Sequence, residues 1–149
     1  MRLTNGFDIS SSALTAQRLR MDVISSNIAN ADTTRARLVN GKWVPYQRKL
    51  VAIEPKAQPS FAQTLQSAMA DGTGEGVKVT KIFEDNAPLK QVYNPTHPDA
   101  DENGFVMMPN VDVLKEMVDM ISATRSYEAN VTALNASKTM ITKALEIGR

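Results

Sequence analysis

The chain has 149 residues, of which 42% are hydrophobic and 22% charged, and its formal net charge is +1. A near-neutral chain of this kind is not expected to bind a polyanion over its whole surface. The absence of cysteine excludes disulfides, thiol catalysis and cysteine-ligated metals, and the length predicts one domain.

Residues 8–31 are predicted to form the first helix. Apolar side chains recur every seven residues in two neighbouring columns, which is typical of a helix packed along one side. We expect Asp8 to cap this helix and the polar stretch 30–34 to end it, because short polar side chains compete for backbone groups. The two columns are Phe7, Leu14, Met21 and Ile28, and Ile9, Ala16 and Val23.

The middle of the chain, residues 35–110, contains all seven prolines and five of the seven glycines, which favours short strands and turns. Asn40-Gly41 predicts a two-residue hairpin turn. Residues 61–69 are compatible with a short helix or with no regular structure, and the glycine-rich stretch 70–76 is expected to be a flexible connector. Strands are expected at 35–39, 43–53, 77–83 and 105–108.

The last third of the chain carries the strongest pattern, which we call the seam. From Val113 on, seam residues recur at alternating spacings of four and three, with no proline or glycine before Gly148. This pattern predicts a helix about 50 Å long that packs against other helices, capped by Asn110 or Asp112. Such a helix is too long to bury inside one small globule, so the sequence favours an assembly subunit. The seam is Val113, Met117, Met120, Thr124, Tyr127, Val131, Leu134, Lys138, Ile141 and Leu145.

A second apolar edge runs beside the seam, and one partner helix cannot cover both. We therefore expect contacts with other chains. The predicted fold is α+β, with long N- and C-terminal helices forming an antiparallel coiled-coil hairpin around a small β-rich unit. The helical domain is expected to comprise 1–34 and 110–149, and the β-rich insertion 35–109. The second edge is Leu114, Val118, Ile121, Met140, Ala144 and Ile147.

Two asparagines near the end of the first helix have two interpretations. Asn27 and Asn30 lie three residues apart, on one helix face. In the simpler interpretation, their amides satisfy carbonyls at the helix end. In the other, the small Ala29 and Ala31 allow close helix approach, and the asparagines fix the helix register as a buried polar residue does in a coiled coil.

The remaining motifs do not build a catalytic or metal site. Residues 99–104 match the start of an EF-hand loop, but Asn110 stands where a bidentate glutamate is required, so calcium is not expected. The glycines at 72–76 lack the spacing of a nucleotide-binding loop, and the single histidine, His97, has no spaced acidic partner. We therefore expect no enzyme activity, no cofactor and no metal.

A basic stretch with interleaved aromatics spans residues 35–49. It could bind single-stranded nucleic acid. Alternatively it is a charged hairpin that meets an acidic patch on a neighbouring subunit, such as Asp99, Asp101 and Glu102. The near-neutral net charge favours the second interpretation. The basic and aromatic residues are Arg35, Arg37, Lys42, Trp43, Tyr46, Arg48 and Lys49.

Taken together, these motifs resemble a known family. Ser-x-Asn-Ile-Ala-Asn-x-x-Thr, here residues 25–33, resembles the N-terminal signature of the bacterial flagellar rod and hook proteins. The C-terminal part is similar to the proximal rod branch of that family, and the resemblance is weak over residues 54–76. The similar C-terminal segments are 108–113, 116–121, 125–130 and 134–135, with further matches at 8–10, 17–18 and 94–100.

The resemblance implies a structural subunit of the flagellar basal-body rod, with both terminal helices in the inner coiled-coil layer of a tube. It implies as partners copies of itself, other rod subunits and the flagellar type III export apparatus, with export to the basal body without a cleaved signal. Another rod or hook protein and a nucleic-acid-binding module are the alternatives. The expected assembly interface is Leu14, Met21, Asn27, Ile28, Asn30, Met117, Met120, Tyr127, Asn130, Val131, Leu134, Ile141 and Leu145.

Overall fold

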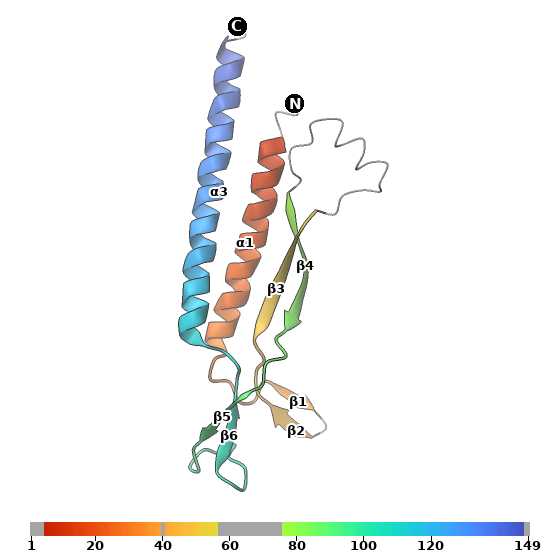
Figure 1. Cartoon of the computed structure of the whole chain (residues 1–149), viewed down its shortest axis with the longest axis vertical. Coiled ribbons are helices and arrows are strands. Elements are labelled where there is room, and N and C mark those ends of the chain that lie inside the picture. Colours follow the sequence, from red (N-terminus) through yellow and green to blue (C-terminus); the bar gives the residue numbers. More distant parts are fainter. Residues whose placement is uncertain (1–4, 40, 57–75, 148–149) are drawn as a thin grey trace, which may run out of the picture. The chain divides into compact units, whose positions relative to one another are not determined.

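The computed structural model describes residues 5–39, 41–56 and 76–147. In this part of the chain one long helix comes first in the sequence, six short strands follow, and a second long helix comes last. The fold class is therefore α+β (Figure 1). No helix among the described residues is long and apolar enough to span a bilayer. The elements are α1 (Asn5–Ala29), β1 (Arg37–Val39), β2 (Lys42–Val44), β3 (Lys49–Pro55), β4 (Val77–Glu84), β5 (Lys90–Tyr93), β6 (Phe105–Met108) and α3 (Val113–Ile147).

Contacts within the chain divide it into two compact units, and both helices contribute to each. The first unit contains the described residues of Met1–Arg20, Ala52–Lys81 and Ser122–Arg149. The second unit contains those of Met21–Val51 and Ile82–Ile121.

The ends of the helices show which polar residues act as caps. Helix α1 begins at Asn5, so the prediction that Asp8 caps it was wrong; Asp8 lies in the first turn, where a negative charge is favourable. Helix α3 begins at Val113, and Asp112 caps it because its Oδ1 accepts hydrogen bonds from two backbone N–H groups of the first turn. Of the two predicted caps, Asp112 is the correct one.

The buried stripes of the helices are narrow and partly polar. On α1 the most buried positions include Ala16, Val23 and Asn27. Ala16 and Val23 belong to the second predicted column, so that column is the more buried of the two. On α3 the buried positions are Glu116 and Ala123, each one residue before a member of the seam. A search for large apolar residues does not detect this column, because its members are charged or small.

The predicted hairpin around Asn40-Gly41 is confirmed. Strands β1 and β2 pair antiparallel, with Leu38 opposite Trp43, and Gly41 has a φ of 79°, which suits glycine. Asn40 itself lies outside the described residues. The strand expected at 43–53 is instead split into β2 and β3, because Pro45 has no N–H to donate to a strand ladder.

Three two-stranded sheets are formed, namely β1–β2, β3–β4 and β5–β6. The predicted strands at 77–83 and 105–108 are confirmed as β4 and β6. Strand β5 was not anticipated, because all four of its residues are exposed and show no apolar alternation. The interpretations of 61–69 and of the connector at 70–75 concern residues outside the described part of the chain.

Candidate functional site

A buried polar cluster occupies the centre of the second unit. Asn27 and Glu116 are each only 1% exposed, and both are among the largest fully buried side chains of the described residues. Asn27 comes from the last turns of α1 and Glu116 from the first turn of α3. Tyr46 and Arg48 come from the segment between β2 and β3, and Arg48 directly precedes β3. Segments far apart in sequence therefore meet through polar groups in the second unit.

Asn27 uses its full hydrogen-bonding capacity in this cluster. Its Nδ2 donates to the carbonyl of Lys49 at 2.9 Å and to Glu116 Oε2 at 3.0 Å. Its Oδ1 accepts from the Tyr46 hydroxyl at 3.0 Å and from the backbone N–H of Lys49 at 2.9 Å. An asparagine side chain offers two donors and two acceptor lone pairs, so none is left unpaired.

The Glu116 carboxylate is held by a guanidinium on its other side. Arg48 Nε and a terminal Arg48 nitrogen both lie 2.6 Å from Glu116 Oε1. Two further carboxylates, of Asp119 and Asp85, lie 3.5 and 3.7 Å from Arg48. A buried carboxylate is tolerated only when it is paired and hydrogen-bonded, and this geometry meets both conditions.

Asn110 extends the cluster through backbone groups. Its Oδ1 accepts from the N–H of Arg48 at 2.8 Å, and its Nδ2 donates to the carbonyls of Asp85 and Ala87, each at 3.2 Å. The residue considered as a helix cap thus joins the start of β3 to the segment that follows β4. The cluster therefore ties backbone segments together.

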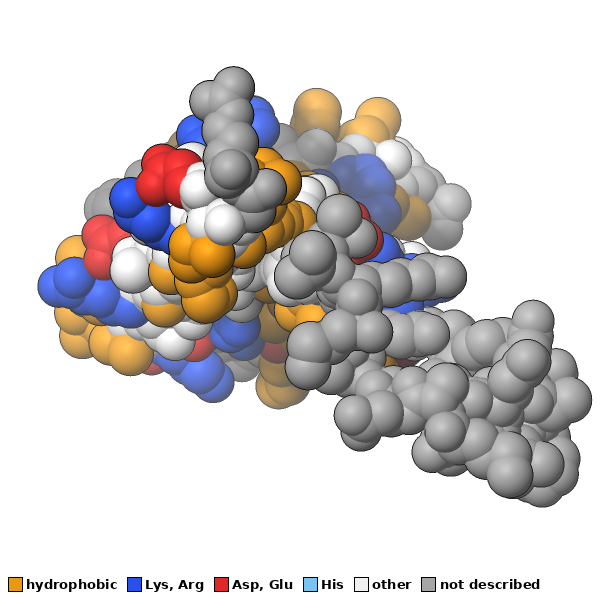
Figure 2. All heavy atoms as spheres, turned by 90° about the horizontal axis from the view of Figure 1, so that it is seen from above, with side chains coloured by type: hydrophobic (Ala, Val, Ile, Leu, Met, Phe, Trp, Pro, Cys, Tyr) orange, Lys and Arg blue, Asp and Glu red, His pale blue; other side chains and the backbone are white. Residues whose placement is uncertain are grey.

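Outside this cluster, α3 exposes an apolar stripe. Leu114, Val118 and Ile121 are 76%, 67% and 60% exposed, and they follow one another at helical spacing on one face. Figure 2 shows hydrophobic side chains at the surface of the molecule beside charged ones. Exposed apolar patches of several large side chains mark protein–protein contact sites.

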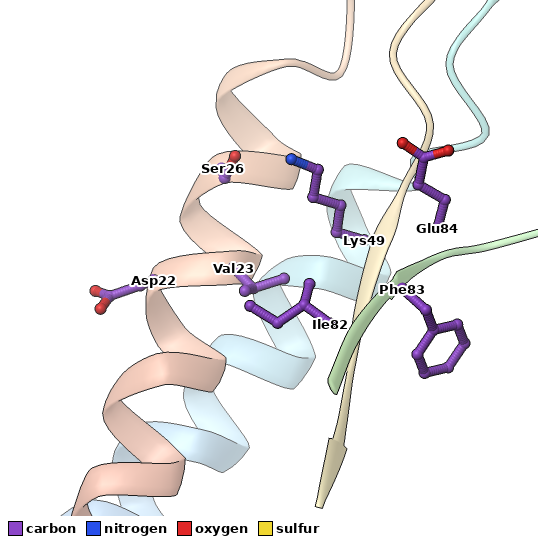
Figure 3. A pocket seen from close by; sticks show the side chains of 7 residues that line it. All are labelled: Asp22, Val23, Ser26, Lys49, Ile82, Phe83 and Glu84. Carbon is purple, nitrogen blue, oxygen red and sulfur yellow. The ribbon is translucent and has the colours of Figure 1, made fainter. Parts of the chain in front are cut away.

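The second unit also has an open hollow of about 450 Å³ (Figure 3). Val23 of α1 and Ile82 of β4 point toward each other across it, whereas Phe83 and Asp22 point away. Its polar lining residues are Asp22, Ser26, Lys49 and Glu84; the Lys49 amine points toward Ser26, and the Asp22 carboxylate points away from both. Among the residues that the structure describes, no group of three histidines, cysteines or acids could hold a metal ion.

The basic hairpin is partly neutralised within its own chain. Arg35 Nε donates to Asp99 Oδ1 at 2.6 Å, and a second Arg35 nitrogen also contacts this carboxylate. The hydrogen bond from Arg35, followed by one from Thr34, lowers the pKa of Asp99 below its ordinary value. Asp99, predicted as one possible partner for the basic hairpin of a neighbouring subunit, is thus paired within its own chain.

The residues predicted for assembly have very different environments. Asn27 is buried, while Met117 and Leu145 are 50% and 71% exposed. Asn30 and Asn130 each donate to a carbonyl four residues earlier, which for Asn30 fits the helix-end interpretation. The other predicted residues are half-buried: Leu14, Met21, Ile28, Met120, Tyr127, Val131, Leu134 and Ile141.

Sequence reasoning missed three members of the cluster. From the sequence, Glu116 is expected only to be an acid in the first turn of a helix. Arg48 and Tyr46 are expected only to belong to a basic stretch with aromatic residues. One feature of the sequence could have indicated that Glu116 is buried: it stands seven residues before the small Ala123, on the same face of α3.

Comparison with known proteins identifies the family of the chain. The family model described as "Flagella basal body rod protein" matches residues 7–37, and "Flagellar basal body rod FlgEFG protein C-terminal" matches residues 102–147. A flagellar basal-body rod protein FlgC of Bacillus subtilis is 58% identical, and the alignment covers the whole length of both chains. The chain belongs to the FlgC family of flagellar basal-body rod proteins.

Other FlgC proteins are also similar over nearly the whole length. The one from Salmonella typhimurium is 46% identical over all of both chains, and the one from Borreliella burgdorferi is 44% identical over 99% of this chain and 98% of its own. Membership of the FlgC family makes this chain a structural subunit of the basal-body rod and not an enzyme. The family does not favour the nucleic-acid alternative.

Proposed function

We propose that the chain builds the rod by pairing α1 and α3 as an antiparallel coiled-coil hairpin, whose uncovered apolar edge meets copies of itself and other rod subunits. The observation that carries this proposal is the exposed stripe of Leu114, Val118 and Ile121. Leaving three large aliphatic side chains in water is unfavourable for a monomer, and covering them in an assembly removes that apolar area from water.

Contacts at both ends of the helices support the antiparallel arrangement. In the second unit, Asn27 near the end of α1 bonds Glu116 near the start of α3. In the first unit, a Cβ added to Gly6, near the start of α1, would lie 3.6 Å from Ser137 Oγ, late in α3. Both contacts are those expected if the start of each helix lies by the end of the other.

The hairpin can be tested with one engineered disulfide, since the chain has no cysteine of its own. Gly6→Cys combined with Ser137→Cys should oxidise to an intramolecular disulfide in dilute protein, because the two sites are close enough for disulfide geometry. Gly6→Cys with Lys115→Cys, at the other end of α3, is the control and should stay reduced. A control that forms the disulfide as readily as the test pair would refute the antiparallel arrangement.

The apolar edge is tested by placing a charge on it. Val118→Asp should leave the isolated subunit folded, because the side chain is 67% exposed, but should abolish assembly. Burying an unpaired carboxylate costs at least several kcal/mol. Light scattering over a concentration series and motility of cells carrying the variant are the measurements. Asn135→Asp, which adds the same charge at an exposed site that belongs to neither the seam nor the second apolar edge, should be tolerated.

The other parts of the proposal follow from the family and the sequence. The helical domain would comprise 1–34 and 110–149, and the β-rich insertion 35–109 would lie toward the outside of the rod. The basal body is the location that the FlgC relatives support. The export route would be the flagellar type III apparatus without a cleaved signal. The predicted assembly residues from Leu14 to Leu145 would line the subunit contacts, apart from Asn27, which is buried within its own subunit.

A further inference from the structure

The buried cluster contains a charged residue, Glu116, that assembly through exposed apolar edges does not require. An apolar residue at position 116 would bury as well as glutamate without the cost of desolvating a charge. Glu116 is nevertheless 1% exposed, and each of its oxygens is bonded to a specific partner, Arg48 on one side and Asn27 on the other. In some proteins, buried polar interactions of this kind select between alternative packings without adding net stability.

The geometry points to a register lock: Asn27, Arg48 and Glu116 select which turn of α1 faces the start of α3. The inference rests on the proposed hairpin and deepens it, because two long helices with repeating apolar columns can pair in more than one register. Neighbouring subunits would then recognise the one register that the lock selects.

A shift of α1 by one helical turn would break the lock. It would bring Val23 or Ile24, both buried and apolar, to the position of Asn27, and neither can donate to Glu116 Oε2. A shift in the other direction would bring Ala31, whose side chain has no donor, or Asn30, which has one N–H left beside its bond to the Ser26 carbonyl, where Asn27 uses two. In either case a buried acceptor of the lock would lose its donor.

The lock also fixes the strand that begins beside it. The backbone N–H and C=O of Lys49 bond the Oδ1 and Nδ2 of Asn27, while the Arg48 side chain bonds Glu116. Tyr46 adds its hydroxyl to Asn27 Oδ1. An alternative register would therefore have to break the bonds to β3 as well as those between the helices, so the selection involves three segments at once.

The register can be measured with the disulfide reporter described above. In the parent chain, Gly6→Cys should link to Ser137→Cys and not to Leu134→Cys or Ile141→Cys, which lie about one turn away on either side. In the variant Asn27→Leu/Arg48→Met/Glu116→Leu, the melting temperature should fall, because the Lys49 backbone groups and the Tyr46 hydroxyl lose their partner on Asn27. In the same variant, the cysteine at position 6 should no longer link mainly to position 137 and should form disulfides with positions 134, 137 and 141.

A gentler variant keeps the test decisive if the triple variant does not fold. Asn27→Asp removes the donor and places two carboxylates against each other, so it should scatter the links in the same way. Asn30→Asp is the matched control and should keep the parent pattern, because Asn30 bonds only within its own helix end. Asn27→Asp/Glu116→Gln exchanges donor and acceptor between positions 27 and 116 but leaves the Lys49 carbonyl without its donor, so it should restore part of the parent link.

The outcomes separate the lock from the proposed function. A single link between positions 6 and 137 in a folded triple variant, or in Asn27→Asp, would overturn the lock and leave the hairpin standing. Absence of that link in the parent chain would refute the hairpin, and the lock with it. Scattered links in a lock variant that still assembles normally would show that subunits do not recognise the register, and would overturn that part of the inference.

Discussion

Removing the Arg48 side chain should be among the most destabilising single changes in this protein. Arg48→Ala takes away both 2.6 Å contacts to Glu116 Oε1 and leaves the carboxylate with Asn27 as its remaining side-chain donor. Because Glu116 is 1% exposed, water cannot replace the lost partner without local unfolding. Breaking a buried ion pair on one side typically costs about 3–5 kcal/mol.

The measurement is chemical unfolding of the isolated subunit near neutral pH, followed by far-ultraviolet circular dichroism. A loss of this size corresponds to a fall in melting temperature of about 10 °C for a chain of this length. The matched control is Arg125→Ala, which breaks the exposed 3.0 Å pair of Arg125 with Glu128. Exposed pairs contribute at most about 1 kcal/mol, so this control should unfold almost like the parent.

A second variant tests the cause of the effect. If the cost of Arg48→Ala comes from the orphaned charge, then Arg48→Ala/Glu116→Leu should be more stable than Arg48→Ala alone, since it removes that charge. The reasoning would be refuted if Arg48→Ala unfolded within about 1 kcal/mol of the Arg125→Ala control. It would also be refuted if the double variant were the less stable of the two.

The remaining predictions concern the second unit. The pKa of Asp99 is lowered in the folded chain by Arg35, so its stabilising effect is present above the unfolded pKa of about 3.9 and is lost as pH falls through the folded value. With Asp99→Asn, the unfolding free energy should therefore decrease less steeply as the pH falls, measured as the urea midpoint against pH. The same steepness in the variant and the parent would contradict this. Gly104→Ala should destabilise more than Gly41→Ala. Both glycines have positive φ, which costs about 1–2 kcal/mol for other residues, but only at Gly104 would the new Cβ meet a side chain, 3.0 Å from Tyr93. Equal melting temperatures would argue against that contact.

The local features of this fold could be predicted from the sequence because each depends on a few neighbouring residues. The long helices follow from apolar columns at helical spacing, and the turn before Lys42 follows from Asn40-Gly41, whose glycine has the expected positive φ. The cap at Asp112 follows in the same way from the next few backbone N–H groups. The family signature is also local, so its residue types and spacing indicate the flagellar rod and hook proteins without any contact between distant segments.

The polar centre was decided by tertiary structure alone. Glu116 is 89 residues from Asn27 and 68 from Arg48 in the sequence, so no local pattern relates them. In the sequence, a glutamate in the first turn of a helix is explained fully by the helix dipole, and an arginine in a basic stretch by solvation. Only the folded chain brings these groups within hydrogen-bonding distance, where each compensates the burial of the other.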